Sequence, residues 1–346
     1  MKRYSYLEKI MHRQFLGDNP FSNYLFERNF SKSSSQDSIS KSNDIFITGL
    51  ARSGTTALLN KIYSSGEVGS LLYKFMPFIL YPELSNYFHK VSNNKKNIFM
   101  ERFHKDGIKI NINSPECLDE VFWIKAHKNE YKKSFLVPFQ VDQNTLEAYC
   151  YLIKKFEFIL LKNRMVIKNN NNHLRLESLV NCFTSCYFIF TYRDPIYQAF
   201  SLLNQHLNFI KLKKKDEFIL EYMNLIGHFE FGLGLKSFNY YEKDNYFKNK
   251  DRLNINYWLE QWIKTHKWVL NKKLYKNKNL IIISYEDLCY DYKLYKKLCE
   301  KIKIKNNHSG VPFKLANKIM DLDICKKDLL KTAKEIYEEL KFYSLN

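Results

Sequence analysis

The sequence predicts an α/β protein in which a parallel β-sheet is flanked by helices, within a single elaborated domain. Four short apolar segments, each suited to a buried strand, alternate with longer segments whose apolar residues recur at helical spacing. Two of these strand candidates are followed directly by loops that carry an arginine. No stretch rich in Gly, Ser or Pro divides the 346 residues into two patterned halves.

The N-terminal part is predicted to be an extension of residues 1–43, followed by the main domain at residues 44–346. Residues 31–43 are polar and rich in serine, which predicts a flexible lead into the first strand. Before this lead, several large apolar side chains are expected to pack onto the domain: Phe15, Leu16, Phe21, Tyr24, Leu25 and Phe26.

The first strand candidate, residues 44–48, is joined to a helical pattern at residues 57–63 by the loop Gly-Leu-Ala-Arg-Ser-Gly-Thr-Thr. This strand–loop–helix context is typical of a phosphate-binding loop. Gly49 and Gly54 permit backbone angles at which successive N–H groups converge on one anion. Loops that bind ATP or GTP have a lysine after the second glycine, but here a threonine follows it and the cation is Arg52.

The second strand candidate lies at residues 165–168, between helical patterns at residues 144–161 and 176–183. It ends on Lys168, and a run of asparagines at residues 169–172 predicts a turn. The sequence therefore predicts a cation at the carboxyl end of this strand.

The third strand candidate, residues 187–192, is followed by Arg193, by Asp194 as a helix cap, and by a helix that runs to about Leu207. Ser201 lies about 140° from the expected core face of this helix, so it is predicted to stay outside the core. Arg193 lies where open α/β sheets bind ligands. The expected core face consists of Ile196, Ala199, Phe200, Leu203 and Leu207.

The fourth strand candidate, residues 280–285, is preceded by a helix whose core side chains are expected to include Trp258 and Trp262. It is followed by Glu286 and Asp287, which are interpreted as the acidic start of a helix.

These two arginine motifs resemble those of the sulfotransferases that use 3′-phosphoadenosine 5′-phosphosulfate (PAPS). The resemblance implies a P-loop-like sulfotransferase fold and a phosphosulfate cradle formed by Arg52, Ser53, Gly54, Thr55 and Thr56. It assigns the 3′-phosphate to Arg193 and Ser201, which have the spacing of the family's site, and the chemistry suits a forked guanidinium and a hydroxyl.

The resemblance covers about residues 44–298 and is to the bacterial branch of the family, as residues 76–78 and 101–108 indicate. It implies sulfuryl transfer to a hydroxyl, or to an amine, of an acceptor such as a bacterial surface glycan or a lipid-linked sugar. Cytosolic members place a tryptophan that stacks on adenine where Ala57 stands, so this contact is in doubt. Their C-terminal Arg-Lys-Gly element is also not found.

For the reaction itself, Arg52 is expected to neutralise the bridging oxygen and Lys168 to add positive charge, so that no metal is needed. His104 is predicted to be the general base, because it stands in a polar turn after the donor loop. Four carboxylates remain as rivals for this role: Glu67, Glu101, Asp106 and Glu120.

Composition leaves two other functions open. A P-loop kinase that uses ATP is disfavoured by the missing lysine and by the lack of an acidic motif for magnesium. A net charge of +19 also suits a basic, non-enzymatic polyanion-binding protein, but the lysines are dispersed and no nucleic-acid motif occurs.

The seven cysteines form no C-x-x-C pair and predict buried free thiols.

The sequence carries no apolar stretch of membrane-spanning length and no signal peptide. We therefore expect a cytoplasmic enzyme, peripheral to the inner face of the membrane if its acceptor is lipid-linked. The sequence does not predict the oligomeric state.

Overall fold

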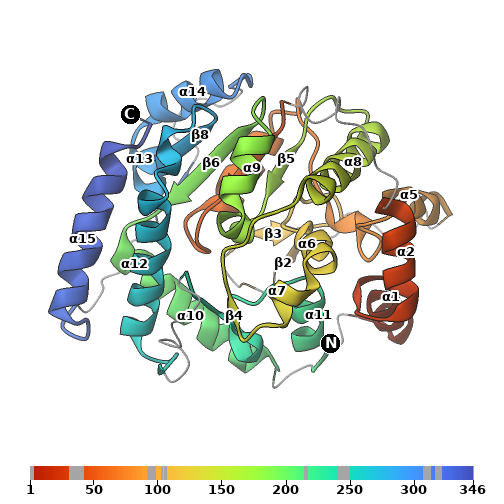
Figure 1. Ribbon diagram of the computed structural model, residues 1–346, viewed down its shortest axis with the longest axis horizontal. Coiled ribbons are helices and arrows are strands. Elements are labelled where there is room, and N and C mark those ends of the chain that lie inside the picture. Colours follow the sequence, from red (N-terminus) through yellow and green to blue (C-terminus); the bar gives the residue numbers. More distant parts are fainter. Residues whose placement is uncertain are drawn as a thin grey trace.

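A computed structural model describes residues 4–30, 43–91, 99–102, 104, 107–213, 217–240, 250–306, 313–315 and 322–345. The predicted flexible lead lies outside these residues, apart from Asn43. The central sheet contains β5 (Val166–Lys168), β1 (Ile45–Thr48), β6 (Tyr187–Tyr192) and β8 (Leu280–Ser284), in this order and all parallel (Figure 1). All four predicted strands are thus confirmed, and so is the α/β fold class.

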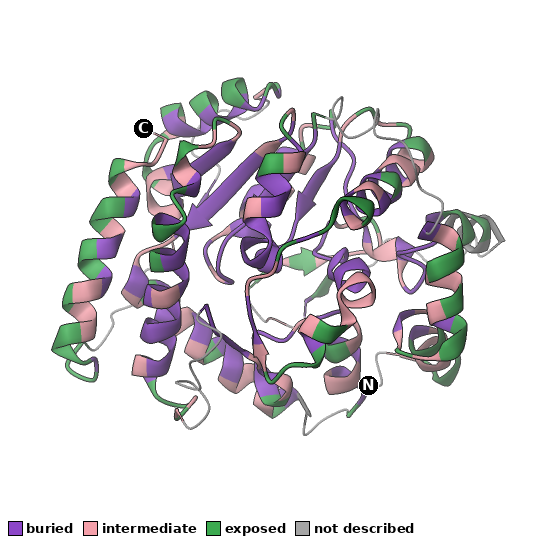
Figure 2. Cartoon of the chain, in the orientation of Figure 1, coloured by how far each residue is buried: buried purple, intermediate pink, exposed green. Residues whose placement is uncertain are grey.

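The sheet is buried on both faces because alternate side chains of each strand enter two separate cores. Phe46 and Phe188 join the larger core, which packs against α8 (Gln143–Leu160), α9 (Leu176–Cys182) and α12 (Ile255–Asn271). Ile45, Ile47 and Ile189 join the smaller core with α4 (Thr55–Tyr63) and α14 (Tyr292–Lys301). Figure 2 shows the strands buried and α15 (Lys327–Phe342) exposed along its outer side.

The remaining helices surround this sheet. They are α1 (Tyr6–Leu16), α2 (Pro20–Phe30), α5 (Pro82–Val91), α6 (Glu120–Ala126), α7 (Lys128–Lys132), α10 (Pro195–Lys213), α11 (Phe218–Leu225), α13 (Tyr285–Tyr290) and α15 (Lys327–Phe342). Four short strands pair outside the main sheet: β2 (Met100–Glu101) with β3 (Lys109–Ile110), and β4 (Phe135–Leu136) with β7 (Ser237–Phe238). Within the described residues, no helix has both the length and the apolar character needed to cross a membrane.

The N-terminal helices pack onto the domain through part of the expected set. Leu16 joins the larger core, and Phe15, Leu25 and Phe26 pack against it. Phe21 and Tyr24 are exposed, contrary to the prediction. The boundary of the extension at residue 43 stays a prediction. None of the seven cysteines forms a disulfide, and all are buried except Cys182 and Cys289, which are half-buried.

The predicted core face of α10 is wrong in its rotational phase. Ala199 is buried as expected, but Phe200 and Leu203 are only half-buried, and Gln198 and His206 are buried in their stead. Gln198 is buried because it makes hydrogen bonds to backbone and to an indole, a cause that apolar periodicity does not detect.

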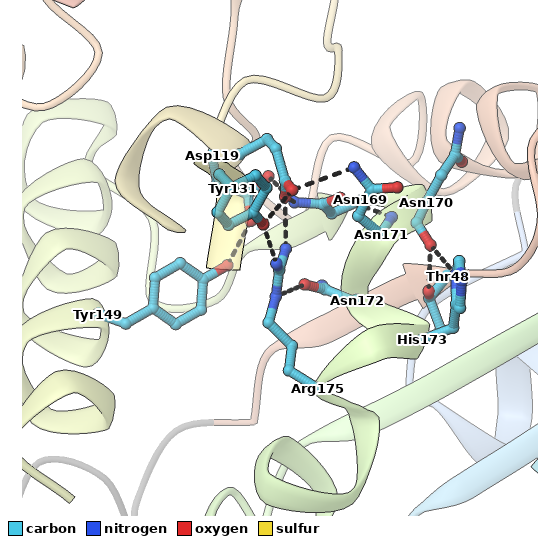
Figure 3. Close-up of polar contacts among 11 residues, drawn as sticks. Thr48, Asp119, Tyr131, Tyr149, Asn169, Asn170, Asn171, Asn172, His173 and Arg175 are labelled. Carbon is cyan, nitrogen blue, oxygen red and sulfur yellow. Dashed lines mark hydrogen bonds and ion pairs between the residues drawn. The ribbon is translucent and has the colours of Figure 1, made fainter. Parts of the chain in front are cut away.

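The asparagine run forms η2 (Asn170–Leu174), a buried 3₁₀-helix held by a polar network (Figure 3). At the centre of the network, the Arg175 guanidinium lies 2.5 Å from the Glu120 carboxylate, and both side chains are fully buried. Glu120 also accepts hydrogen bonds from the amides of Asn169 and Asn171 and from the Tyr131 hydroxyl. The network therefore fixes the backbone directly after β5, beside the carboxyl end of the sheet.

We expect Glu120→Gln to destabilise the fold by about 3–5 kcal/mol, because it leaves the Arg175 charge buried beside a neutral amide. The matched control is Glu221→Gln, which breaks the Arg13–Glu221 pair on the surface, where side-chain exposure is 48% and 37%. This control should cost less than about 1 kcal/mol. Urea denaturation followed by circular dichroism measures both, and equal losses would show that the buried network does not hold the fold.

Candidate functional site

The loop between β1 and α4 has the backbone geometry of an anion cradle. Gly49 and Gly54 have φ of 140° and 86°, and Arg52 also has a positive φ, of 71°. A Cβ on Gly54 would lie 2.1 Å from the ring of Tyr285, so both the backbone angle and the neighbouring ring require glycine here. The loop leads directly into the first turn of α4, whose N–H groups have no acceptor within the helix.

Three contacts hold the loop in place, two from α10 and one from β6. The Gln198 amide donates to the carbonyl oxygens of Leu50 and Ala51, at 3.0 and 2.9 Å. The Ser53 hydroxyl lies 2.8 Å from that of Thr191 and is fully buried. Since the Ser53 N–H also donates to Leu50 O, this serine braces the loop, and the amides of the next residues are better placed for a ligand.

The two arginine motifs meet in space, as their positions at strand ends predict. Arg52 Nε donates to the Ser201 hydroxyl on α10 at 3.1 Å. Ser201 is half-buried and so stays outside the buried core, as predicted, although the core face from which its orientation was derived is wrong. Thr55 donates to the side-chain oxygen of Asn170 at 3.0 Å, which joins the loop to the turn after β5.

Arg193 lies at the end of β6 beside a half-buried carboxylate. Its Nε is 3.4 Å from Glu286 Oε1, and the two side chains are 12% and 15% exposed. The guanidinium also lies 5.8 Å from the ring centre of Tyr285 and 5.9 Å from that of Tyr197. Burial raises the pKa of Glu286 to about 7, although Arg193 acts in the opposite direction. The interpretation of Glu286 as part of an acidic helix start is incomplete, because this side chain faces Arg193.

A cavity of about 460 Å³ opens at this edge of the sheet. Among the described residues that line it, six are Arg or Lys and none is Asp or Glu, so the lining favours an anionic ligand. The six cations are Arg52, Lys61, Arg102, Lys168, Arg193 and Lys314. The loop residues Gly54, Thr55 and Thr56 line the same cavity, together with Asn170, His104, His228, Phe231, Tyr285 and Phe313.

Two of these cations share one buried carboxylate. Glu116 accepts from Arg102 at 2.9 Å and from Lys168 at 3.2 Å. Burial alone would raise the pKa of Glu116, but Lys168 and Arg102 hold it well below its usual value. Arg102 also reaches the hydroxyl of Thr56, at 3.4 Å. Lys168 is therefore a buried, ion-paired cation at the cavity wall.

The structure separates the candidates for the general base. His104 lines the cavity. Glu120 belongs to the buried network, Glu101 is exposed, and Glu67 contacts Lys305 after the end of α4, remote from the loop. Asp106 lies outside the described residues.

The sequence did not identify four charged or titratable groups of the site: Arg102, Glu116, His228 and Glu230. Each comes from a loop or a short strand with no periodic pattern. The spacing of His228 and Glu230 was a usable signal, because residues two apart in an extended segment can face the same side. For Glu116, whose partners lie on other segments, no such signal exists.

Comparisons with known proteins identify the family of the chain. A profile of the Sulfotransferase family matches residues 44–226, which is more than half of the chain and includes both arginine motifs. The chain therefore belongs to the sulfotransferase family, whose members transfer sulfuryl groups. No curated protein matches the sequence.

Two solved structures are similar. A sulfotransferase from Mycobacterium tuberculosis shares 12% identity at a TM-score of 0.48, covering 98% of this chain and 86% of that one. A second sulfotransferase, from Mycobacterium avium, shares 12% identity at a TM-score of 0.46, covering 95% of this chain and 75% of that one.

An anion bound by Arg193 should make Glu286 take up a proton, because the added negative charge disfavours a carboxylate whose pKa is already about 7. We expect adenosine 3′,5′-bisphosphate to bind at pH 7.5 with more proton uptake in the wild type than in Glu286→Gln. When the pH is lowered from 8 to 6.5, the affinity of the wild type for this nucleotide should rise more than the affinity of Glu286→Gln. Calorimetry in two buffers of different ionisation enthalpy measures the uptake. Glu221→Gln is the matched control, and equal uptake in all three proteins would contradict the coupling.

Proposed function

We propose that this protein transfers the sulfuryl group of PAPS to a hydroxyl, or to an amine, of an acceptor. The observation that carries the proposal is the cationic cavity into which both arginine motifs open. PAPS is a polyanion with charge at two separate positions of one nucleoside, and the two motifs offer separate sites for these charges. Family membership supports the chemistry, because the shared reaction of the family is sulfuryl transfer.

The loop would bind the phosphosulfate. The N–H groups of Gly54, Thr55 and Thr56 begin α4, where the helix dipole also favours an anion. Arg52 lies inside this loop, so its guanidinium is suited to the oxygen that bridges phosphorus and sulfur. As the S–O bond to the donor breaks, negative charge develops on that oxygen, and a fixed cation there lowers the barrier. Lys168, held by Glu116, would add positive charge at the cavity wall.

The 3′-phosphate would bind between Arg193 and Ser201. Arg52 Nε donates to Ser201 in the structure, so the two motifs are close enough to hold one nucleotide. An incoming phosphate would compete with Glu286 for Arg193, since both are anionic and the ion pair at 3.4 Å is long.

The adenine would stack on aromatic side chains from elsewhere in the chain. Ala57 lines the cavity where cytosolic members have tryptophan, so no ring stands on α4 itself at that position. Tyr285 and Phe313 line the same cavity, with ring centres 6.1 Å apart. Their rings offer the apolar surface that a purine needs.

For the acceptor we propose a glycan or a lipid-linked sugar, from the resemblance to bacterial sulfotransferases. The cytoplasmic location, with peripheral attachment to the inner membrane face for a lipid-linked acceptor, stays a prediction. We propose that no metal ion takes part, because the cations of the cavity supply the positive charge that magnesium supplies in kinases.

Removal of a 3′-phosphate ligand should weaken the discrimination between two nucleotides that differ only in the 3′-phosphate. We expect the wild type to bind adenosine 3′,5′-bisphosphate about 10- to 100-fold more tightly than adenosine 5′-monophosphate, from charge-assisted hydrogen bonds to the 3′-phosphate. Arg193→Ala should remove most of this ratio and Ser201→Ala a smaller part, with little change in binding of the monophosphate. Arg28→Ala, on the surface of α2, is the matched control. A ratio unchanged in Arg193→Ala, measured by calorimetry, would contradict the assignment.

Arg52→Ala should lower the rate of sulfuryl transfer by about 100-fold or more, because it removes the cation nearest the breaking bond. The assay follows labelled sulfate from PAPS into fractions of a host extract, which also isolates the acceptor. The control is again Arg28→Ala, which should transfer at the wild-type rate. A rate that survives in Arg52→Ala would overturn its role, and product formed from ATP and magnesium in place of PAPS would favour a kinase.

A further inference from the structure

A second histidine lies in the cavity beside a buried carboxylate. His228 and Glu230 stand in the segment between α11 and η3 (Gly232–Gly234), and His228 Nδ1 is 2.8 Å from Glu230 Oε2. Glu230 is 6% exposed and does not line the cavity, whereas His228 does. Because the carboxylate engages Nδ1, the nitrogen left for a ligand in the cavity is Nε2.

The environment of Glu230 keeps it ionised. Burial acts to raise the pKa of this carboxyl group, but the contact with His228 and the more distant charge of Lys168 lower it overall. A carboxylate at this distance from Nδ1 favours the tautomer with the proton on that nitrogen, and so leaves Nε2 as the acceptor. The pair thus has the arrangement of a proton acceptor and the group that orients it.

His104, the base that the sequence predicts, lies in the opposite environment. Its ring centre is 5.3 Å from that of His228, so both rings face the same part of the cavity. Burial, and then the charges of Arg102 and His228, hold the pKa of His104 well below its usual value. Arg52 acts in the same direction, and Glu116 only partly offsets these charges. A ring whose charged form is disfavoured to this extent is a poor proton acceptor.

We propose that His228, oriented by Glu230, is the general base that takes the proton from the acceptor during sulfuryl transfer. The inference rests on the proposed function. The acceptor oxygen forms a bond to sulfur, the bond from sulfur to the bridging oxygen breaks, and the acceptor proton passes to His228 Nε2. Adenosine 3′,5′-bisphosphate leaves with the electron pair of the broken bond. In this proposal His104 helps to shape the part of the cavity that binds the acceptor.

The test compares His228→Asn, Glu230→Gln and His104→Asn with the wild type, in labelled transfer from PAPS to the fraction that the wild type labels. We expect His228→Asn to lower kcat by about 100- to 10,000-fold, with binding of adenosine 3′,5′-bisphosphate changed less than about threefold. His104→Asn should lose less activity. The double variant that combines His228→Asn with Glu230→Gln should be no slower than His228→Asn alone, because the two residues act as a unit.

The double variant separates this role from a structural one. A structural loss in Glu230→Gln would add to the loss in His228→Asn, whereas the loss of an orienting group is already contained in it.

Three results would overturn the inference. The first is a His228→Asn enzyme that retains a third or more of the wild-type kcat. The second is a loss of activity that is explained by a loss of nucleotide binding. The third is a double variant that is slower than His228→Asn by the full factor that Glu230→Gln causes alone. A wild-type protein that neither binds adenosine 3′,5′-bisphosphate nor transfers sulfate from PAPS would overturn the proposed function instead.

Discussion

The site depends on the contact between the Gln198 amide and the carbonyls of Leu50 and Ala51. This contact ties the β1–α4 loop to α10, the helix that follows Arg193. Gln198 in turn accepts a hydrogen bond at 3.0 Å from the indole of Trp262 on α12. The loop conformation, with its positive φ angles, is therefore held by hydrogen bonds that connect the loop to α10, and α10 to α12. A preorganised loop of this kind can present N–H groups to an anion without rearrangement.

The charges of the cavity are arranged in two layers. Cations form the lining, and the carboxylates that balance them lie behind it: Glu116 behind Arg102 and Lys168, and Glu286 behind Arg193. Without these carboxylates, so many like charges in one cavity would repel each other and weaken the fold. With them, the cations keep fixed positions while the lining itself stays attractive to an anion. Glu230 has the same relation to His228, which connects charge balance to proton transfer.

Much of the fold could be predicted because the signals are local. Each of the four strands is a short apolar run, and the two loops that follow β1 and β6 carry the glycine, arginine and capping residues that their geometry requires. The contact between Arg52 and Ser201 was not itself predicted, but the proximity of the two arginine motifs follows from the same logic, since parallel strands bring their carboxyl ends together.

The parts that could not be predicted arise from contacts between distant segments. The phase of α10 differs because Gln198 is buried by hydrogen bonds. Lys168 is buried because Glu116, from an irregular loop, lies within reach. The ring of Tyr285 lies close to Gly54, although more than two hundred residues separate the two in the sequence. Glu120 was a candidate base only because its partner Arg175 could not be recognised from the sequence.

The central claim is that the two arginine motifs hold opposite ends of one nucleotide, and a crystal structure of the complex with adenosine 3′,5′-bisphosphate tests it most directly. We predict the 5′-phosphate on the N–H groups of Gly54, Thr55 and Thr56, with the 3′-phosphate within hydrogen-bond distance of Arg193 and Ser201. A nucleotide that contacts one motif alone, that binds with its phosphates exchanged, or that binds outside the cavity would contradict the account.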